Sequence, residues 1–278
     1  MRKIKQYLIV SLFCVLSLFS LFGCDVETQR ELKDITKSLT EDVGQALKDI
    51  GKLGKEAFNE ISGMLGSSKK QNTTRIENPE DFVFNDYYSI NGFAEIVYDI
   101  PAVGNIVYGK LDKYGRASYV IANLDYSTVK RARDRGRLPI NVDPSGWPQN
   151  KKVVITEKDG RSYRGYFYNR SHMLADSLGG EPIKENLVTG TRTQNVGIKN
   201  QGGMAYTEIQ AREFFVVPTE ETLIYQVRPV YNSDEPIPRY VIVDVKSSDD
   251  KIDEQVIVDN SVNGYKINYS TGEFKLIN

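Results

Sequence analysis

The sequence predicts an α+β domain built around a mostly antiparallel β-sheet and preceded by an amphipathic helical stalk. Three observations predict this fold class. From residue 82 onward, short segments rich in β-forming residues alternate with turn residues. One segment near residues 205–215 has the apolar spacing of a helix, and a second helical pattern lies upstream of the domain, between Leu32 and Leu65.

The individual elements follow from local patterns. The expected strands are Ala94–Ile100, Ile106–Leu111, Ala117–Leu124, Lys152–Glu157, Arg161–Tyr168, Thr222–Val230, Arg239–Lys246, Glu254–Asp259 and the hairpin Tyr265–Asn268/Phe274–Leu276. Residues 158–160 read Lys-Asp-Gly, a turn signal that joins two of these strands as a hairpin. The expected helix is Ala205–Phe215, and the stretch between Tyr168 and Ala205 is expected to be a loop region rich in Gly and Asn.

Composition excludes several kinds of site. Both cysteines lie within the first 24 residues, so the body of the protein has no thiolate metal site and no intrachain disulfide. His172 is the single histidine, which excludes any site that needs two imidazoles from one chain. With 36 Lys and Arg against 37 Asp and Glu, no overall field attracts a polyanion, so a nucleic-acid site must come from local clustering of charge.

The N-terminus has the pattern of a signal peptide. Basic residues in the first five positions precede the uncharged apolar run Tyr7–Phe22. The run ends in Leu-Phe-Gly-Cys at residues 21–24, which resembles a lipobox and implies lipidation of Cys24 after removal of residues 1–23. The alternative is an uncleaved transmembrane anchor, although the core is short for a bilayer span. Both interpretations place the body outside the cytoplasm and tether it to a membrane.

Two segments separate this signal from the predicted domain. Residues 24–66 form the expected amphipathic stalk, for which a docking or membrane-surface helix is the alternative interpretation. Residues 67–81 have almost nothing apolar to bury and are expected to be a flexible linker. The catalytic domain is therefore expected to span residues 82–278.

Candidate chemistry lies in three neighbouring segments. Residues 168–180 read Tyr-Asn-Arg-Ser-His-Met-Leu-Ala-Asp-Ser-Leu-Gly-Gly and place Arg170 and His172 at the end of an expected strand, at a rim that substrate can reach. Residues 186–197 carry Asn186 and Asn195 in a stretch rich in Thr and Gly, and residues 202–208 end on Glu208.

These segments resemble the DNA/RNA non-specific endonucleases of the ββα-metal class, in particular the secreted DNases and DNA-entry nucleases of Gram-positive bacteria. The resemblance covers roughly residues 90–235. It implies His172 as the general base, Arg170 as the motif arginine and Asn195 as a ligand of one Mg²⁺, with Mn²⁺ as a substitute. It also implies supporting roles near the metal for Asn186 and Glu208. The chain has Asn169 and Ser171 where the family motif has Asp and Gly.

The residue types suit phosphodiester hydrolysis. An imidazole accepts a proton near neutral pH, and a hard cation needs few oxygen ligands because it keeps most of its waters. Arg212 follows Glu208 by one helical turn, and its guanidinium matches two oxygens of a phosphate.

Structural alternatives exist for each residue. A lone histidine is often a surface or satisfied core residue, and Asn195 could cap a helix. Glu208 and Arg212 could form an ion pair on a helix surface.

A basic run precedes several prolines. It comprises Lys130, Arg131, Arg133, Arg135 and Arg137, with a single acid between them. It is expected to project as a loop or finger that neutralises phosphates irrespective of sequence, the alternative being a solvated face. Trp147, flanked by prolines, packs beneath this loop or stacks on a base.

The sequence thus predicts a membrane-anchored, extracytoplasmic, Mg²⁺-dependent endonuclease of a Gram-positive bacterium that acts on DNA or RNA. The competing hypotheses are a non-catalytic DNA-binding surface receptor on the same fold and a structural lipoprotein whose helix recruits a partner.

Overall fold

The computed structural model describes residues 83–157 and 160–277. The chain divides into two units, residues 1–71 and 72–278, and all described residues belong to the second. The expected signal peptide with Cys24, the stalk and the linker lie outside the described residues. Within them, no helix has both the length and the apolar character needed to span a bilayer.

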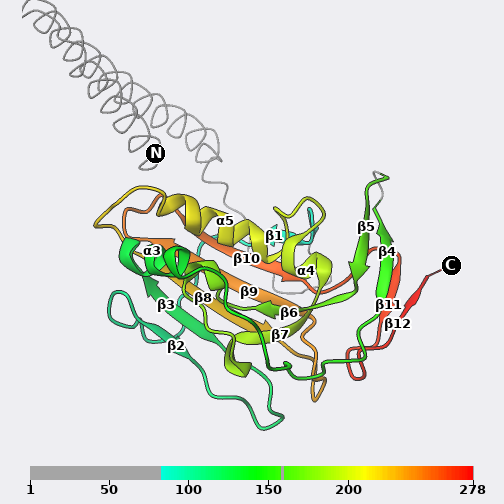
Figure 1. Ribbon diagram of the computed structural model, residues 1–278. Helices are drawn as coiled ribbons and strands as arrows, with labels where there is room; N and C mark the ends of the chain where they lie inside the picture. Colours follow the sequence, from blue (N-terminus) through cyan, green and yellow to red (C-terminus); the bar gives the residue numbers. More distant parts are fainter. Residues whose placement is uncertain (1–82, 158–159, 278) are drawn as a thin grey trace, which may run out of the picture. The chain divides into compact units, whose positions relative to one another are not determined.

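A six-stranded antiparallel sheet forms the centre of the domain, with strand order β1-β10-β9-β8-β3-β2 (Figure 1). Its strands are β1 (Tyr88–Ile90), β2 (Ile106–Tyr108), β3 (Val120–Leu124), β8 (Leu223–Val230), β9 (Tyr240–Ser247) and β10 (Asp253–Asp259). This confirms the α+β class. The expected strands in these regions are confirmed except Ala94–Ile100, and β1 was not expected.

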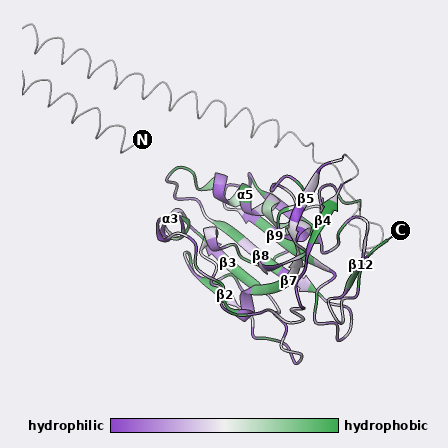
Figure 2. Cartoon of the chain, turned by 45° about the vertical axis from the view of Figure 1, so that its right-hand side comes forward, coloured by the Kyte–Doolittle hydropathy of each residue, from purple (hydrophilic) through white to green (hydrophobic). Residues whose placement is uncertain are grey.

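One face of the sheet carries the main hydrophobic core. Side chains alternate along each strand, so Val243 and Val245 of β9 share a face with Val256 and Val258 of β10. Helix α5 (Met204–Phe214) packs on this face and confirms the expected helix at 205–215. Figure 2 shows hydrophobic residues concentrated along the strands.

The opposite face is polar and is covered by an extended segment. Gln226 and Asp244 are fully buried there, and their side chains accept hydrogen bonds from the backbone N–H groups of Val97 and Glu95, both at distances below 3 Å. Residues 91–105 therefore lie across the sheet without joining a ladder, and the expectation of a strand at 94–100 was wrong. Side chains take the place of a neighbouring strand as hydrogen-bond partners for this backbone.

A two-stranded ribbon leads into a short helix beside the main sheet. Strand β6 (Tyr168–His172) pairs antiparallel with β7 (Leu187–Thr191), and α4 (Arg192–Val196) follows directly. Short 3₁₀ turns, η2 (Asp176–Leu178) and η3 (Lys184–Asn186), lie in the connection. The loop expected between Tyr168 and Ala205 thus contains a strand and a helix, and the expected strand Arg161–Tyr168 is divided between two ribbons.

The basic run is a helix and not a loop or finger. Helix α3 (Tyr126–Arg135) begins after Asp125, whose side chain accepts a hydrogen bond from the Thr128 backbone N–H. Val129 and Ala132, three positions apart, are buried. The helix ends at Gly136, whose φ of 78° is a conformation that favours glycine. The Asp125 cap is the local signal for this helix, whereas the prolines that favoured a loop lie beyond its C-terminal end.

A second, smaller core supports the edge of the domain. The hairpin β4 (Lys152–Thr156)/β5 (Ser162–Tyr166) and the hairpin β11 (Tyr265–Ile267)/β12 (Phe274–Leu276) both contribute to it, which confirms these expected strands. Phe167 and Phe274 stack at its centre with ring centroids 3.7 Å apart.

Candidate active site

Strand β6 places His172 beside a cavity. His172 is opposite Leu187 in the β6–β7 ladder, and the next residue, Met173, donates its backbone N–H to the Asn186 carbonyl at 2.8 Å. The strand therefore ends immediately after the histidine, in fixed backbone geometry.

Helix α4 presents Asn195 to the same ribbon. Its first turn is capped by Thr191, whose hydroxyl accepts a hydrogen bond from the Gln194 backbone N–H at 3.0 Å. The Ser171 hydroxyl donates to Oδ1 of Asn195 at 2.9 Å. The amide oxygen is thus held by the residue directly before His172.

A close turn connects α4 to α5. Gly203 has a φ of 55°, and a Cβ at this position would lie 2.2 Å from the Gln194 carbonyl oxygen. Only glycine fits such an approach, which brings the start of α5 against α4. On α5, Glu208 and Arg212 are one turn apart with charged atoms at 3.7 Å, and the Glu208 side chain is only 15% exposed.

Residues from five elements, α3, β6, η2, α4 and α5, line one cavity of about 480 Å³. Its polar and charged lining includes Arg133, Arg137, His172, Asn195, Glu208 and Arg212. The histidine and the amide that the sequence proposed as partners therefore face one space, together with the acid and arginine of α5 and two arginines of the basic run.

The cavity keeps His172 uncharged. Burial lowers the pKa of His172 to about 4, and the cationic Arg137 and Arg135 act in the same direction, whereas Asp176 opposes them. The Nε2 atom is shielded from solvent and makes no hydrogen bond with the described residues. The imidazole is consequently neutral, and able to accept a proton, throughout the physiological pH range.

The environment of Glu208 also favours the uncharged form, which for a carboxyl group means a raised pKa. Burial raises the pKa of Glu208 to about 7, although the ion pair with Arg212 lowers it in part. Glu208 therefore changes charge near neutral pH. Arg212 is also held by the Ser177 hydroxyl, to which it donates at 3.2 Å.

Asn186 lies outside the cavity lining and has another task. It is fully buried, its Oδ1 accepts from the Leu174 backbone N–H at 2.9 Å, and its Nδ2 donates to the carbonyls of Leu174 and Glu181. A Cβ on Gly180 would lie 2.8 Å from that Nδ2 atom. Asn186 thus fixes the chain that follows His172, and because the backbone occupies both ends of its amide, we do not assign it to a metal.

Arg170 also points elsewhere. Its guanidinium donates to Asp143 at 2.7 Å and lies over the Trp147 ring, 4.5 Å from the centroid. Trp147 packs against the smaller core and not beneath the basic run, where it was expected. Arg170 is absent from the cavity lining and is bound to Asp143.

The basic run divides into two groups. Lys130 pairs with Asp134, Arg131 binds the hydroxyls of Ser127 and Thr128, and Arg135 forms an ion pair with Asp176 at 2.8 Å. Arg133 and Arg137 instead line the cavity. The cluster was expected to act as one surface, yet its members have different partners, because four of them lie on different sides of α3 and Arg137 follows the helix cap at Gly136.

Sequence reasoning missed Ser171 and Asp176. Ser171 holds Asn195, and Asp176 joins α3 to the turn after His172, accepting from both Arg135 and the Leu138 backbone. Ser171 immediately precedes His172, and alternation along a strand places neighbours on opposite faces, so its inward position could have been anticipated. The pairing of Asp176 with α3 has no local signal.

The donor set fits a hard divalent cation with mostly water ligands. Asn195 and Glu208 supply oxygen atoms to the cavity. Within residues 83–157 and 160–277, no three His, Cys, Asp or Glu side chains come together as a metal-binding cluster. An ion bound here would therefore rely on the amide, one carboxylate, water and substrate oxygens, which is the coordination that Mg²⁺ tolerates.

Comparison with known proteins identifies the family of the chain. A family model described as DNA/RNA non-specific endonuclease matches residues 95–249, more than half of the chain. The chain belongs to the DNA/RNA non-specific endonuclease family. The match contains every residue that lines the cavity.

Individual members of the family are also similar. A deoxyribonuclease of Streptococcus dysgalactiae subsp. equisimilis is 32% identical over 199 residues, which cover 61% of this chain and 60% of that relative's length. The solved structure of Sda1 nuclease with bound zinc ion is 31% identical, covers 67% of this chain and 95% of that one, and superposes with a TM-score of 0.63. NucA from Streptococcus agalactiae with magnesium ion bound is 24% identical, with coverage of 67% and 84% and a TM-score of 0.50, and supports the fold alone.

Proposed function

We propose that the protein is a divalent-metal-dependent, sequence-non-specific endonuclease that hydrolyses phosphodiester bonds of DNA or RNA. The observation that carries the proposal is the cavity in which His172, Asn195, Glu208 and Arg212 meet two arginines of the basic run. Membership of the endonuclease family gives the same reaction class.

His172 is the proposed general base. Because Nε2 is enclosed without a hydrogen-bond partner among the described residues, Nδ1 is the nitrogen that we assign to the attacking water. A pKa near 4 keeps the ring neutral before the reaction. Asp176 stabilises the imidazolium that forms once the proton is taken, since its carboxylate is the nearby acid that raises this pKa.

Asn195 and Glu208 are the proposed metal-binding side chains. Ser171 orients the amide oxygen, and Arg212 holds the carboxylate of Glu208 in position. A bound Mg²⁺, with Mn²⁺ as a substitute, would neutralise the phosphate and stabilise the departing 3′-oxygen. Arg133, Arg137 and Arg212 can bind nonbridging phosphate oxygens, which stabilises the extra charge of the transition state without reading the base sequence.

Plasmid digestion tests this proposal. Wild-type protein is expected to degrade supercoiled DNA with Mg²⁺ or Mn²⁺ and to stop when EDTA is added. His172→Ala should lose activity by at least about 100-fold, the usual contribution of a general base, while its melting temperature and DNA affinity remain. Asn195→Ala should lose the response to Mg²⁺, and Asn232→Ala, an exposed asparagine outside the cavity, is the matched control.

The outcomes separate the competing functions. Cleavage that survives in His172→Ala would remove the general-base assignment. Binding of DNA by the wild type without cleavage in any metal would instead select the non-catalytic surface receptor. Unchanged Mg²⁺ dependence in Asn195→Ala would remove the ligand assignment.

The location of the enzyme is a separate proposal. The N-terminal pattern ending at Cys24 supports a lipid-anchored protein on the outer side of the cell membrane of a Gram-positive bacterium. In cells that express the full chain, labelled palmitate is expected to be incorporated into the wild type and not into Cys24→Ser. A wild type that stays in the membrane fraction without incorporating label would indicate the uncleaved transmembrane anchor.

A further inference from the structure

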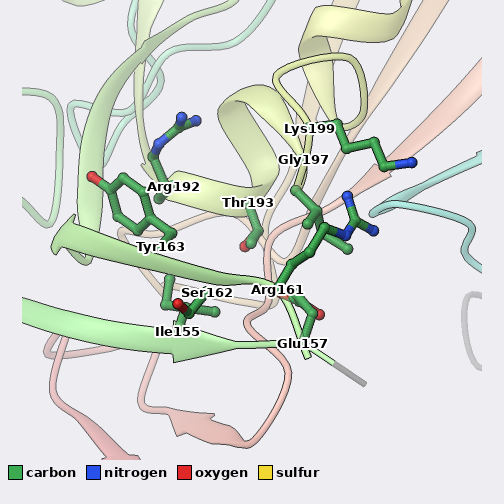
Figure 3. Close-up of a pocket in the computed structure, with 10 residues that line it drawn as sticks. Ile155, Glu157, Arg161, Ser162, Tyr163, Arg192, Thr193, Gly197 and Lys199 are labelled. Carbon is green, nitrogen blue, oxygen red and sulfur yellow. The ribbon is translucent and has the colours of Figure 1, made fainter. Parts of the chain in front are cut away.

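A second, smaller cavity lies between the β4–β5 hairpin and α4. It has a volume of about 220 Å³ and is separate from the cavity that contains His172. In Figure 3, Arg161 extends from the hairpin toward the loop that carries Lys199, and Arg192 lies beside the ring of Tyr163. The hairpin and α4 thus enclose a space with basic side chains around it.

The charge of this cavity is positive. Arg161, Arg192 and Lys199 line it, against one acid, Glu157. Glu157 accepts a hydrogen bond from the Tyr87 hydroxyl at 2.9 Å, so part of its hydrogen-bonding capacity is used outside the basic group. Asp86 adds a second carboxylate beside the lining, since its Oδ1 accepts a hydrogen bond from the Ile198 backbone N–H at 2.6 Å. Three cations beside two acids still give a local field that attracts an anion.

Two of these cations are not neutralised by carboxylates. Arg192 binds Oδ1 of Asn200 and lies 4.8 Å above the Tyr163 ring, and both of these partners are uncharged. Lys199 is exposed. In the part of the chain that the structure describes, neither Arg192 nor Lys199 forms an ion pair. The guanidinium is therefore fixed in orientation by neutral groups and keeps its full charge for a ligand.

Helix α4 forms a wall of both cavities. Asn195 and Val196 line the active cavity, whereas Arg192 and Gly197 line the basic one. A helix with its side chains is about 10 Å in diameter, and each nucleotide of a strand advances about 3.4 Å along a duplex. A strand that crosses α4 from the active cavity would therefore reach the basic cavity after about two or three nucleotides.

We propose that the basic cavity binds a backbone phosphate of the strand being cleaved, about two or three nucleotides from the scissile bond. The inference rests on the proposed nuclease function and adds a second point of attachment for the same strand. Arg192 and Lys199 bind the phosphate, while the neutral contacts of Arg192 hold its fork in place. Because only the backbone is contacted, the site increases affinity for long substrates without adding sequence preference.

The test compares long and short substrates in matched double variants. Arg192→Gln/Lys199→Gln removes the two cations of the basic cavity. Arg164→Gln/Lys152→Gln removes one arginine and one lysine from the outer face of the same hairpin, where both are exposed and outside the cavity. The substrates are a 20-base-pair duplex and a chromogenic p-nitrophenyl ester of thymidine phosphate, which is too short to reach the second site.

The effect of the cavity variant should depend on the length of the substrate. The cavity variant should raise KM for the duplex about 10-fold at low salt and leave turnover of the short ester unchanged, whereas the control variant should change neither as much. In EDTA, the slope of log affinity for the duplex against log salt should become shallower by about 0.9, the value for one lost phosphate contact. Lys199→Gln alone, an exposed substitution, should show a part of this change with an unaltered melting temperature.

Several results would overturn the inference. Equal losses in both double variants would mean general electrostatic attraction, and an unchanged salt slope would mean that no phosphate is bound. Inorganic phosphate at constant ionic strength should inhibit duplex cleavage by the wild type more than by the cavity variant. Equal inhibition of the two proteins would mean that the basic cavity binds no phosphate. His172→Ala separates this inference from the proposed function, because it should abolish hydrolysis of both substrates while its binding slope in EDTA remains that of the wild type.

Discussion

Ser171 donates its hydroxyl hydrogen bond to Oδ1 of Asn195 at 2.9 Å, joining the strand that carries the proposed base to the helix that carries the proposed metal ligand. Ser171 is fully buried, so this bond is shielded from competing water. The position differs from the glycine of the family motif. In this chain, the residue before His172 therefore orients the metal ligand directly.

Ser171→Ala is expected to weaken metal binding without removing catalysis. The amide oxygen would lose the contact that orients it, and loss of such supporting contacts typically costs about 10-fold in metal affinity. The Mg²⁺ concentration for half-maximal cleavage should rise by about that factor, while the rate at saturating Mg²⁺ stays close to that of the wild type. Ser270→Ala, at an exposed site, is the control. A Mg²⁺ requirement that does not change in Ser171→Ala would contradict the proposed orientation of Asn195.

His172 should titrate near pH 4 in the chelated protein. As the single histidine of the chain, it gives one imidazole resonance that can be followed by NMR. Because burial and the cations of Arg137 and Arg135 lower its pKa, Arg137→Gln should move the midpoint upward. Arg131→Gln, in the same basic run but bonded to Ser127 and Thr128, should leave it in place. A midpoint near 6.5 in the wild type would mean that the ring is solvated.

The pKa of Glu208 predicts how stability depends on pH. Its folded-state pKa, about 7, exceeds the ordinary value of 4.5, so the folded protein binds the extra proton and this contribution is lost as pH rises from 4.5 to 7. Glu208→Gln removes that loss. In EDTA, the variant should therefore gain stability over the wild type across this interval, by an amount on the order of 3 kcal/mol above pH 7.

Urea unfolding at pH 5 and pH 8 measures this difference. The titration of His172 has the opposite sign, since its lowered pKa makes the protein lose stability as pH falls from 6.5 toward 4, but it is common to both proteins and cancels in the comparison. A Glu208→Gln advantage that is equal at both pH values would show that the carboxyl group is not buried with a raised pKa.

The sequence predicted the elements with strong local patterns and missed those without them. The hairpin turning at Gly160 and the helix around Ala211 have clear turn or apolar spacing signals. Strand β7 has Thr, Gly and Thr at its C-terminal end and is buried along its whole length, so it shows no alternation of polar and apolar residues. Helix α4 contains only five residues, too few for a periodic pattern.

The candidate site was predictable to a similar extent. His172, Asn195 and Glu208 come together as the family resemblance implied, because the motif order follows the chain through β6, α4 and α5. The contribution of α3 depends on tertiary packing, through the ion pair of Arg135 with Asp176. Sequence spacing does not reveal which cations of that helix face the cavity.

Asn186 should behave as a structural residue, and Asn195 as a metal-binding one. Asn186→Ala would leave the buried N–H and carbonyl of Leu174 without partners, which should destabilise the fold by about 1–3 kcal/mol. The molecules that remain folded should need the same Mg²⁺ concentration for activity as the wild type. Asn195→Ala, in contrast, should change that requirement. Thermal unfolding in EDTA, combined with a Mg²⁺ titration of activity at low temperature, separates the two effects. A variant of normal stability with a raised Mg²⁺ requirement would restore Asn186 to the metal site.

The two groups of cations in the basic run should differ in their effect on DNA binding. Arg133 and Arg137 line the active cavity, whereas Lys130 and Arg131 are engaged by side chains of their own helix. If each of the first pair binds one phosphate, Arg133→Gln/Arg137→Gln should reduce the salt slope of duplex binding by about 1.8, or 0.9 for each contact. Lys130→Gln/Arg131→Gln removes the same charge from the same basic run and should reduce the slope by much less. Equal slopes in the two variants would mean that α3 acts only through its total charge, in which case the arginines would have no defined place against the scissile phosphate.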